Sequence, residues 1–411
     1  MTNGDDVRMR GFRGRKDVEE VVRLVDERTK PLPGEPVPVL EAAGRVLARD
    51  AVSMVDVPAF RRSAMDGYAV VAEVTFGATP DDPRALRIVG ESFPAAPAAA
   101  VVGEETCVRI MTGAPMPEGA DAVVPVEQTE RDGDRVRVHA AVTPGRHVGQ
   151  VGEDVKKGQT VLRAGRWLRP QDAGLLSSIG FGRVFVVRSP RVALVVTGSE
   201  LLPAGSMPEG YSIVDSNTPM LLALVKRDGG TLLTGPIVED DRGQVEEALL
   251  VSAREADCVL VTGASSVGQE DHVPNILRER GELPVHGIAM RPSSPAGFGI
   301  LEGKPVFLLP GNPVSCLCAY DFFAGRAVRR MAGRHPGWPH TVVRMPLGKK
   351  IASALGRTDY VRVRIDRNRV VPLAIRGAAI LSSTTRAHGF VIVDRNSEGH
   401  AEGEKVNVYL Y

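Results

Sequence analysis

The pattern of the third quarter of the chain constrains the fold most. From about residue 191, apolar runs such as RVALVVTG, DCVLVTG and KPVFLLPG alternate with helical segments such as TPMLLALVKRDGG and RGQVEEALLVSARE. Strands that are apolar throughout are buried on both faces, and strands that alternate with helices are joined by crossover connections. Residues 191–335 are therefore predicted to form an α/β domain around a mostly parallel sheet.

The rest of the chain carries strand patterns with little helix. Residues 15–30 have the spacing of an amphipathic helix, which the Pro-rich PLPGEPVPV ends. Short apolar runs bounded by Gly, Pro or Asp follow, and alternating strands such as DYVRVRIDRN and EKVNVYLY return near the end. We expect a multidomain α+β protein. Its parts are an elongated linking domain of helical and extended segments (1–58 plus 153–190), a β-rich inserted domain (59–152), the α/β domain (191–335) and a small C-terminal all-β domain (336–411).

Composition excludes several classes of protein. Of 411 residues, 51 are Lys or Arg and 50 are Asp or Glu, a balance that argues against a dedicated nucleic-acid or membrane-surface protein. No apolar run is long enough to span a membrane, and MTNGDDVRMRGFRGRKDVEE lacks the apolar core of a secretory signal. The four cysteines are too few and too oddly spaced for a disulfide framework. We expect a cytoplasmic protein whose cysteines are core residues.

Three loops of the α/β domain are candidates for ligand binding, because ligands bind outside the carboxyl ends of strands in such sheets. They follow VALVV (197–200), CVLV (262–271) and VFLL (310–313). The 262–271 loop suits an anion, since it offers small residues, hydroxyls and backbone N–H groups before a helix. It could equally be a plain turn capped by Asp271, and Pro310-Gly311-Asn312-Pro313 could be only a turn with proline at a helix start.

Charged residues form the second class of candidates. Several carboxylates could hold Mg²⁺ if they converged on a phosphate loop, although each alone could be a helix cap or a solvated side chain. They are Asp66, Asp154, Glu200, Asp240, Asp241 and Asp271.

The arginines allow opposite interpretations. Arg291 in MRPSSP has a planar fork suited to oxyanions, or it is a surface residue. Arg362, Arg364, Arg367 and Arg369 alternate as on the solvent-facing side of a strand. Histidine pairs at zinc-ligand spacing and a GxSxG motif are absent from the sequence, which disfavours a zinc enzyme and a serine hydrolase.

Taken together and in this order, the motifs resemble one family. They are VPAFRRSAMDGYAV (57–70), RIMTGAPMPEGADAVVPVEQT (109–129), GEDV (152–155), VVTGSEL, TGASSVGQEDHV and LLPGNPVS. The chain resembles the molybdopterin molybdenumtransferases, the family of MoeA and the gephyrin E domain, from about residue 15 to its end. SAMDGYAV together with RIMTGAPMPEGAD is the most specific part of the resemblance.

The resemblance implies an activity and an assembly. Such enzymes use adenylyl-molybdopterin and molybdate as substrates, release AMP and give molybdenum cofactor, with Mg²⁺ as the metal. They are homodimers, in which the α/β domain of one subunit and the second domain of its partner share a cleft. A molybdopterin adenylyltransferase and apo-molybdoenzymes are further expected partners.

The resemblance also implies site residues. Those matching family acids and polar groups of the reaction are Asp66, Thr112, Asp154, Glu200, Asp240, Asp271 and Arg291, and Glu200, Asp240 and Asp271 would hold the metal. Substrate binding would fall to Thr262, Gly263, Ser265, Ser266, Gly268, Ser294, Pro310, Gly311, Asn312 and Pro313.

Three motifs depart from the family pattern. KPGKP is here Arg291-Pro292-Ser293-Ser294-Pro295, so one lysine is arginine and the other serine. Loss of one cation–oxyanion contact could weaken binding by about 1.5–3 kcal/mol. GGVSVG has become Gly263-Ala264-Ser265-Ser266-Val267-Gly268, and the expected Ala-Asn-Gly is Ala387-His388-Gly389. Two alternatives to an active insertase therefore stay open: a pterin-binding scaffold with weak insertion activity, and an adenylyltransferase-like enzyme.

Overall fold

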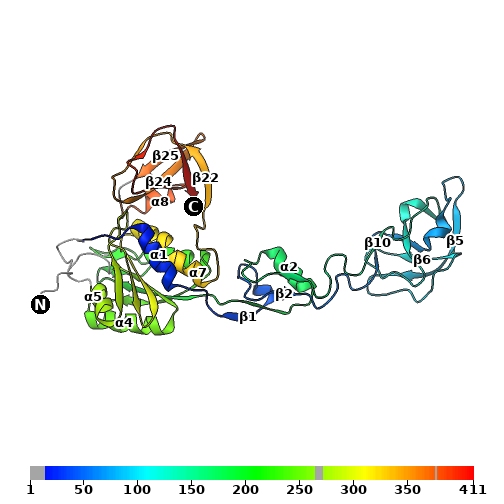
Figure 1. The fold of residues 1–411 in the computed structure, drawn as a ribbon, viewed down its shortest axis with the longest axis horizontal. Helices are drawn as coiled ribbons and strands as arrows, with labels where there is room; N and C mark the ends of the chain where they lie inside the picture. Colours follow the sequence, from blue (N-terminus) through cyan, green and yellow to red (C-terminus); the bar gives the residue numbers. More distant parts are fainter. Residues whose placement is uncertain (1–13, 264–271, 375–376) are drawn as a thin grey trace. The chain divides into compact units, whose positions relative to one another are not determined.

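The computed structural model describes residues 14–263, 272–374 and 377–411 (Figure 1). The chain divides into two compact units. The larger unit comprises Met1–Glu35, Gly44–Val46 and Phe185–Tyr411, and the smaller unit comprises Pro36–Ala43 and Leu47–Val184. The chain passes between them within β1 (Gly34–Pro38), again at 43–44 and 46–47, and within β12 (Arg183–Val187).

A six-stranded sheet forms the centre of the larger unit. Its strand order is β16-β13-β17-β21-β20-β18, and the first four strands run parallel. The strands are β13 (Arg191–Thr197), β16 (Thr231–Val238), β17 (Cys258–Thr262), β18 (Glu282–His286), β20 (Gly297–Leu301) and β21 (Lys304–Leu309). The predicted mostly parallel sheet is confirmed. Strand β20 is antiparallel to both of its neighbours, β21 and β18. Only the Glu302-Gly303 turn joins β20 to β21, and so short a connection cannot cross over.

Helices cover both faces of this sheet, as Figure 1 shows for α4 and α1. One face is packed by α4 (Arg242–Glu255) and α5 (Val273–Arg280), through residues such as Leu249 and Ile276. The other face is packed by a larger set of helices. They are α1 (Val18–Arg28), α3 (Asn217–Arg227), α6 (Pro313–Ala319), the π-helical turn η4 (Tyr320–Ala324) and α7 (Gly325–Met331).

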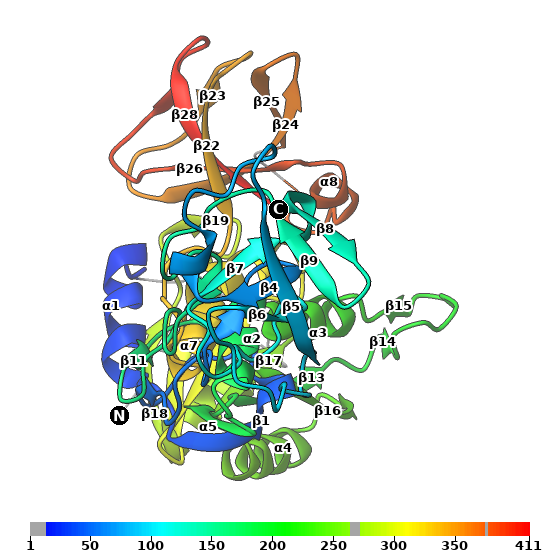
Figure 2. The same cartoon turned by 90° about the vertical axis from the view of Figure 1, so that its right-hand side faces the viewer.

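Helix α3 starts and ends close to where the sequence predicts. Ser216 is the N-cap residue, but its side chain makes no capping bond. The carboxylate of Asp215 accepts the backbone N–H groups of Asn217 and Thr218 instead, at 2.9 and 3.1 Å. Between β13 and α3 the chain forms β14 (Leu201–Leu202) and β15 (Ile213–Val214), which Figure 2 shows extending away from the sheet.

A second sheet closes the chain, also within the larger unit. Its order is β19-β24-β26-β28-β22, with β25 paired to β24. The strands are β19 (Met290–Arg291), β22 (Thr341–Pro346), β24 (Thr358–Asp366), β25 (Arg369–Ala374), β26 (Gly389–Val393) and β28 (Lys405–Leu410). The pair β23 (Ile351–Ala352) and β27 (Gly399–His400) and the short helix α8 (Ser382–Thr385) accompany it (Figure 2). Because β19 pairs with β24, the segment before β20 belongs to this sheet.

The smaller unit is mostly strand. Its main sheet has the order β7-β4-β6-β5-β9-β8 and packs a core on each face, one around Val124 and one around Val123. Those strands are β4 (Gly67–Val70), β5 (Arg84–Ser92), β6 (Thr106–Ile110), β7 (Ala122–Pro125), β8 (Thr129–Asp132) and β9 (Arg135–Val138). The remaining elements are η1 (Val39–Glu41), β2 (Ala51–Val52), β3 (Arg62–Ser63), η2 (Ala72–Thr75), η3 (Val126–Gln128), β10 (Val148–Gly149), β11 (Thr160–Leu162) and α2 (Pro170–Ser178).

The cysteines agree with an expectation from composition. Cys107, Cys258, Cys316 and Cys318 are buried free thiols. Burial raises the pKa of Cys107 to about 12, so this thiol is a core residue. Among the helices of the described residues, none is long and apolar enough to cross a membrane.

Candidate functional site

Two of the predicted acids lie at neighbouring strand ends of the six-stranded sheet. Glu200 follows β13 and Asp240 follows β16. The Asp240 carboxylate accepts the backbone N–H of Ser199 at 3.0 Å, and the Ser199 hydroxyl accepts the backbone N–H of Asp240 at 3.3 Å. This exchange ties the two loops together. The Glu200 carboxylate lies over Gly198, since a Cβ added to that glycine would be 2.9 Å from it.

Carboxylate oxygens at strand ends are the donors that Mg²⁺ prefers, so Glu200 and Asp240 suit the ion chemically. Asp271, the third acid implied by the resemblance, lies outside the described residues. Within 14–263, 272–374 and 377–411, no group of three His, Cys, Asp or Glu side chains is close enough to hold a metal. The metal assignment therefore stays a prediction.

The ends of β17 and β21 meet closely. Gly263 has φ +96°, and a Cβ there would lie 2.1 Å from the carbonyl oxygen of Thr197, so only glycine fits. Thr262 is buried, and its carbonyl accepts the hydroxyl of Thr197 at 3.3 Å. A Cβ on Gly311 would be 3.5 Å from Gly263. Ser265, Ser266 and Gly268, and the substitution Ala264, fall outside the described residues.

A cavity of about 590 Å³ brings together four of the other predicted residues. Arg291, Ser294, Pro310 and Asn312 line it, with further walls from β24 and the start of α6. Gly311 lies between two of these residues, and its carbonyl accepts the Asn217 side-chain amide at 2.8 Å. Pro313 is the first residue of α6. The Ser294 hydroxyl is buried and has no hydrogen-bond partner among the described residues.

The cavity is strongly cationic. Five arginines line it against one acid, Asp17, which is ion-paired with Arg395; the arginines are Arg15, Arg291, Arg357, Arg362 and Arg395. Arginine keeps its charge and presents several N–H donors in a fixed plane, which suits tetrahedral oxyanions. We call these residues and the cavity they line the arginine cavity.

One sequence prediction is wrong here. Arg362 is only 1% exposed, whereas Arg364 on the same face of β24 is exposed, as the alternation predicted. Burial lowers the pKa of Arg362, and its guanidinium donates to the carbonyl of Gly377 at 3.2 Å. Period-two alternation gives the face of a residue but not what covers that face. The sequence did carry a sign that Arg362 is buried. Tyr360 lies on the same face of the strand, and a large aromatic side chain favours a covered position.

Sequence reasoning also missed Arg15, Arg357 and Arg395. They stand in three separate segments, and no motif singled them out. They meet because β19 joins the C-terminal sheet and carries the 289–295 segment to it.

Asp66 and Thr112 lie together in the smaller unit. One oxygen of the Asp66 carboxylate accepts both the hydroxyl and the backbone N–H of Thr112, each at 2.6 Å. The Thr112 hydroxyl bond, followed by the backbone bond, lowers the pKa of Asp66, so the carboxylate is held ionised and exposed. Asp154 is also exposed, and no hydrogen bond among the described residues joins it to Asp66 or Thr112; its backbone N–H donates to Val57 at 3.0 Å.

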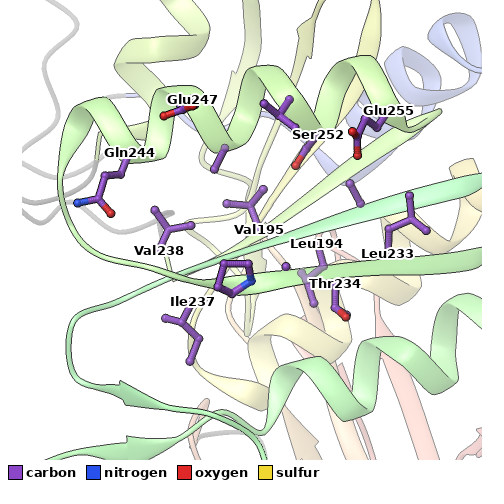
Figure 3. Close-up of a pocket in the computed structure, with 15 residues that line it drawn as sticks. Leu194, Val195, Leu233, Thr234, Ile237, Val238, Gln244, Glu247, Ser252 and Glu255 are labelled. Atoms are coloured by element: carbon purple, nitrogen blue, oxygen red, sulfur yellow. The ribbon is translucent and has the colours of Figure 1, made fainter.

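A second cavity in the larger unit contains none of the predicted residues. It measures about 420 Å³ and lies between α4 and the edge strand β16 (Figure 3). Its walls are largely apolar, with Glu247 and Glu255 as its charged residues. We call it the α4 groove. Its acids would repel an oxyanion, so the arginine cavity is the better candidate for an anionic ligand.

Family models match nearly the whole chain. Residues 16–180 match the MoeA N-terminal region (domains I and II), residues 193–330 a probable molybdopterin binding domain, and residues 344–411 the MoeA C-terminal region (domain IV).

Individual relatives agree with these matches. A putative molybdopterin biosynthesis protein of Methanocaldococcus jannaschii is 35% identical over 95% of both chains. Molybdopterin molybdenumtransferase 2 of Mycobacterium tuberculosis is 37% identical over 85% of this chain and 88% of its own. A crystal structure of the molybdopterin biosynthesis protein MoeA from Pyrococcus horikoshii aligns with a TM-score of 0.80 and 33% identity, covering 97% of this chain and all of the other.

Proposed function

The chain belongs to the MoeA family of molybdopterin molybdenumtransferases, and from this premise we propose that it is an active molybdenum insertase. Its substrates would be adenylyl-molybdopterin and molybdate, and its products molybdenum cofactor and AMP. The observation that carries the proposal is the arginine cavity, which collects cations around two motif loops of the predicted site.

The arginine cavity would bind molybdate. Molybdate is a tetrahedral dianion, and the guanidinium groups of Arg291, Arg357 and Arg362 offer it N–H donors, from a buried side chain at Arg362 and partly exposed ones at Arg291 and Arg357. The hydroxyl of Ser294 and the side-chain amide of Asn312 would complete its hydrogen bonds. A volume of about 590 Å³ exceeds one such anion, which leaves room for the sulfur-bearing end of the pterin beside it.

The neighbouring strand ends would bind the phosphate-bearing part of adenylyl-molybdopterin. Gly263 allows the close approach of backbone that an amide-lined anion site needs. Glu200 and Asp240, together with Asp271, would hold Mg²⁺, which when bound would neutralise charge on the phosphates as the anhydride breaks. Ser199 would keep the Asp240 carboxylate oriented through its backbone N–H.

Asp66 and Thr112 would act on the same substrate from the second domain of a partner subunit. An ionised, exposed carboxylate held by two hydrogen bonds is suited to orienting a water or a hydroxyl. The proposal includes a homodimer in the cytoplasm that receives its pterin from a molybdopterin adenylyltransferase and delivers cofactor to apo-molybdoenzymes. Sedimentation at micromolar concentration tests the dimer, and a monomer alone would contradict the shared cleft.

The test of the function is an insertion assay. The purified protein is incubated with adenylyl-molybdopterin, Mg²⁺ and a molybdate series, and AMP release and reconstitution of an apo-molybdoenzyme are followed. Molybdate-dependent AMP release with reconstitution supports the insertase. Asp240→Asn should abolish the Mg²⁺-dependent turnover while leaving the melting temperature unchanged, and full activity in this variant would remove the metal assignment.

The scaffold is the second candidate, and Ser294 favours it because a cation of the family motif is missing there. Tight pterin binding without AMP release at any molybdate concentration would establish the scaffold. AMP transfer from ATP without molybdate would instead indicate an adenylyltransferase-like enzyme.

A further inference from the structure

A fully buried carboxylate lies directly behind the arginine cavity. Asp359, the second residue of β24, is 0% exposed and is not itself part of the cavity wall. One of its oxygens accepts a guanidinium N–H of Arg291 and the hydroxyl of Ser353, the latter at 2.9 Å. Its other oxygen lies 3.1 Å from Nε of Arg357. Asp359 therefore contacts two of the arginines that line the cavity.

The backbone fixes where this carboxylate sits. Strands β19 and β24 run parallel, and Arg291 and Asp359 are partners in their register. The backbone N–H of Thr358 donates to the carbonyl of Ala289 at 2.9 Å, which locks that register. The contact with Arg291 thus links a segment of the α/β part of the chain to the C-terminal sheet.

Arginine at position 291 suits this arrangement in a way that lysine does not. A guanidinium has five N–H donors in one plane, so it can bind Asp359 through Nη2 and still present donors elsewhere. Nε of Arg291 is buried and has no hydrogen-bond partner among the described residues, while the rest of the side chain lines the cavity. A lysine ammonium is a single point charge that would sit either at the carboxylate or at the ligand.

We propose that Asp359 is a positioning residue that holds Arg291 and Arg357 in the orientation in which their remaining N–H groups bind the oxyanion. The inference rests on the proposed function, since it takes molybdate as the ligand of the arginine cavity. It also explains how arginine replaces a lysine of the family motif at position 291: the carboxylate behind the cavity orients the larger cation.

Positioning and charge balance predict opposite effects of removing the carboxylate. If Asp359 only offset excess positive charge, Asp359→Asn would leave a more positive cavity and molybdate would bind more tightly. If Asp359 positions the arginines, the same change frees both side chains and molybdate binds more weakly. The sign of the change in affinity therefore distinguishes the two roles.

The experiment measures the dissociation constant of molybdate for the full-length protein by titration calorimetry, with a melting temperature for each variant. Asp359→Asn is expected to weaken binding at least tenfold, and Asp359→Glu to recover part of the loss. In the insertion assay the half-saturation for molybdate should rise by a similar factor, while turnover at saturating molybdate changes less than threefold.

Two further variants serve as a charge-matched control and as a milder perturbation of Asp359. Asp366→Asn removes the same charge at the exposed end of β24, beside Arg364, and should change affinity less than twofold. Ser353→Ala removes a neutral contact to Asp359 without touching the cavity, and a two- to fivefold weakening is expected even if Asp359→Asn does not fold.

Equal or tighter molybdate binding by folded Asp359→Asn overturns the positioning role and leaves the proposed function intact. If Asp359→Asn does not fold, unchanged affinity in Ser353→Ala overturns the role. A wild-type protein that binds no molybdate at millimolar concentration overturns the assignment of the cavity itself, and the inference with it.

Discussion

The arginine cavity and the α4 groove have similar sizes and opposite chemistry. They measure about 590 and 420 Å³ and both lie in the larger unit. The α4 groove lies along the edge strand β16, and apolar side chains and two glutamates line it (Figure 3). The arginine cavity lies where the turn after β21, the 289–295 segment and the C-terminal sheet meet. The comparison teaches that charge and buried polar groups, rather than volume, decide which cavity suits an oxyanion.

The largest effect is expected from Arg362→Met. This arginine is buried in the wall of the arginine cavity, so the change removes a cation that is shielded little by water. Charge-assisted contacts of about 1.5–3 kcal/mol correspond to a loss of molybdate affinity of roughly tenfold to a hundredfold. Titration calorimetry with molybdate measures it. Arg364→Met, on the same face of β24 but exposed, is the matched control and should bind normally.

The second prediction concerns pH and the strand that leads into the arginine cavity. Burial, followed by the charge of Arg278, lowers the pKa of His286 at the end of β18 to about 4. The ordinary pKa of histidine is about 6.5. Below that pH the unfolded chain binds a proton at His286, whereas the folded chain does not. The free energy of unfolding should therefore fall by about 3 kcal/mol as the pH drops from about 6.5 to about 4. Above a pH of about 6.5 His286 is neutral in both the folded and the unfolded chain, so this group no longer changes the free energy of unfolding.

Urea unfolding of the wild type and of His286→Gln across this pH window measures the effect. The variant should lose most of the slope, because it has no proton to bind at that position. An identical slope in both proteins would assign the pH dependence to other groups.

Ser294→Lys tests the comparison by adding a positive charge to the arginine cavity. It restores a cation of the family motif at a position that lines the arginine cavity, and molybdate affinity should rise roughly tenfold. Ser252→Lys places the same new charge in the α4 groove and should leave the affinity unchanged. Equal affinity in wild type and Ser294→Lys would mean that the five arginines already suffice.

The smallest effect is expected from neutralising the α4 groove. The double change Glu247→Gln and Glu255→Gln removes the groove's acids, yet molybdate affinity should change less than twofold because exposed charges at a distance are screened by salt. A large gain in affinity would show that the groove itself takes up the anion, and would break the contrast between the two cavities.

Local sequence signals predicted the elements of the α/β part well. The apolar runs at 192–196 and 258–262 are buried parallel strands, and Pro313 begins a helix as its position suggested. The helical segment TPMLLALVKRDGG corresponds to α3, which begins one residue earlier, at Asn217. The antiparallel pair β20 and β21 is set by the turn at Glu302-Gly303, since a tight turn reverses the chain.

By itself the sequence determined the family and the mostly parallel sheet, because these depend on periodicity and on short contiguous segments; the motif residues it assigns to the site stay a prediction. Only the tertiary structure decided that Arg15, Arg357, Arg362 and Arg395 face one cavity with Arg291, and that Asp359 lies behind it. The physical reason is the pairing of β19 with β24, a contact between segments about seventy residues apart. Alternation along a strand gives each side chain a face, but what covers that face is set by distant parts of the chain.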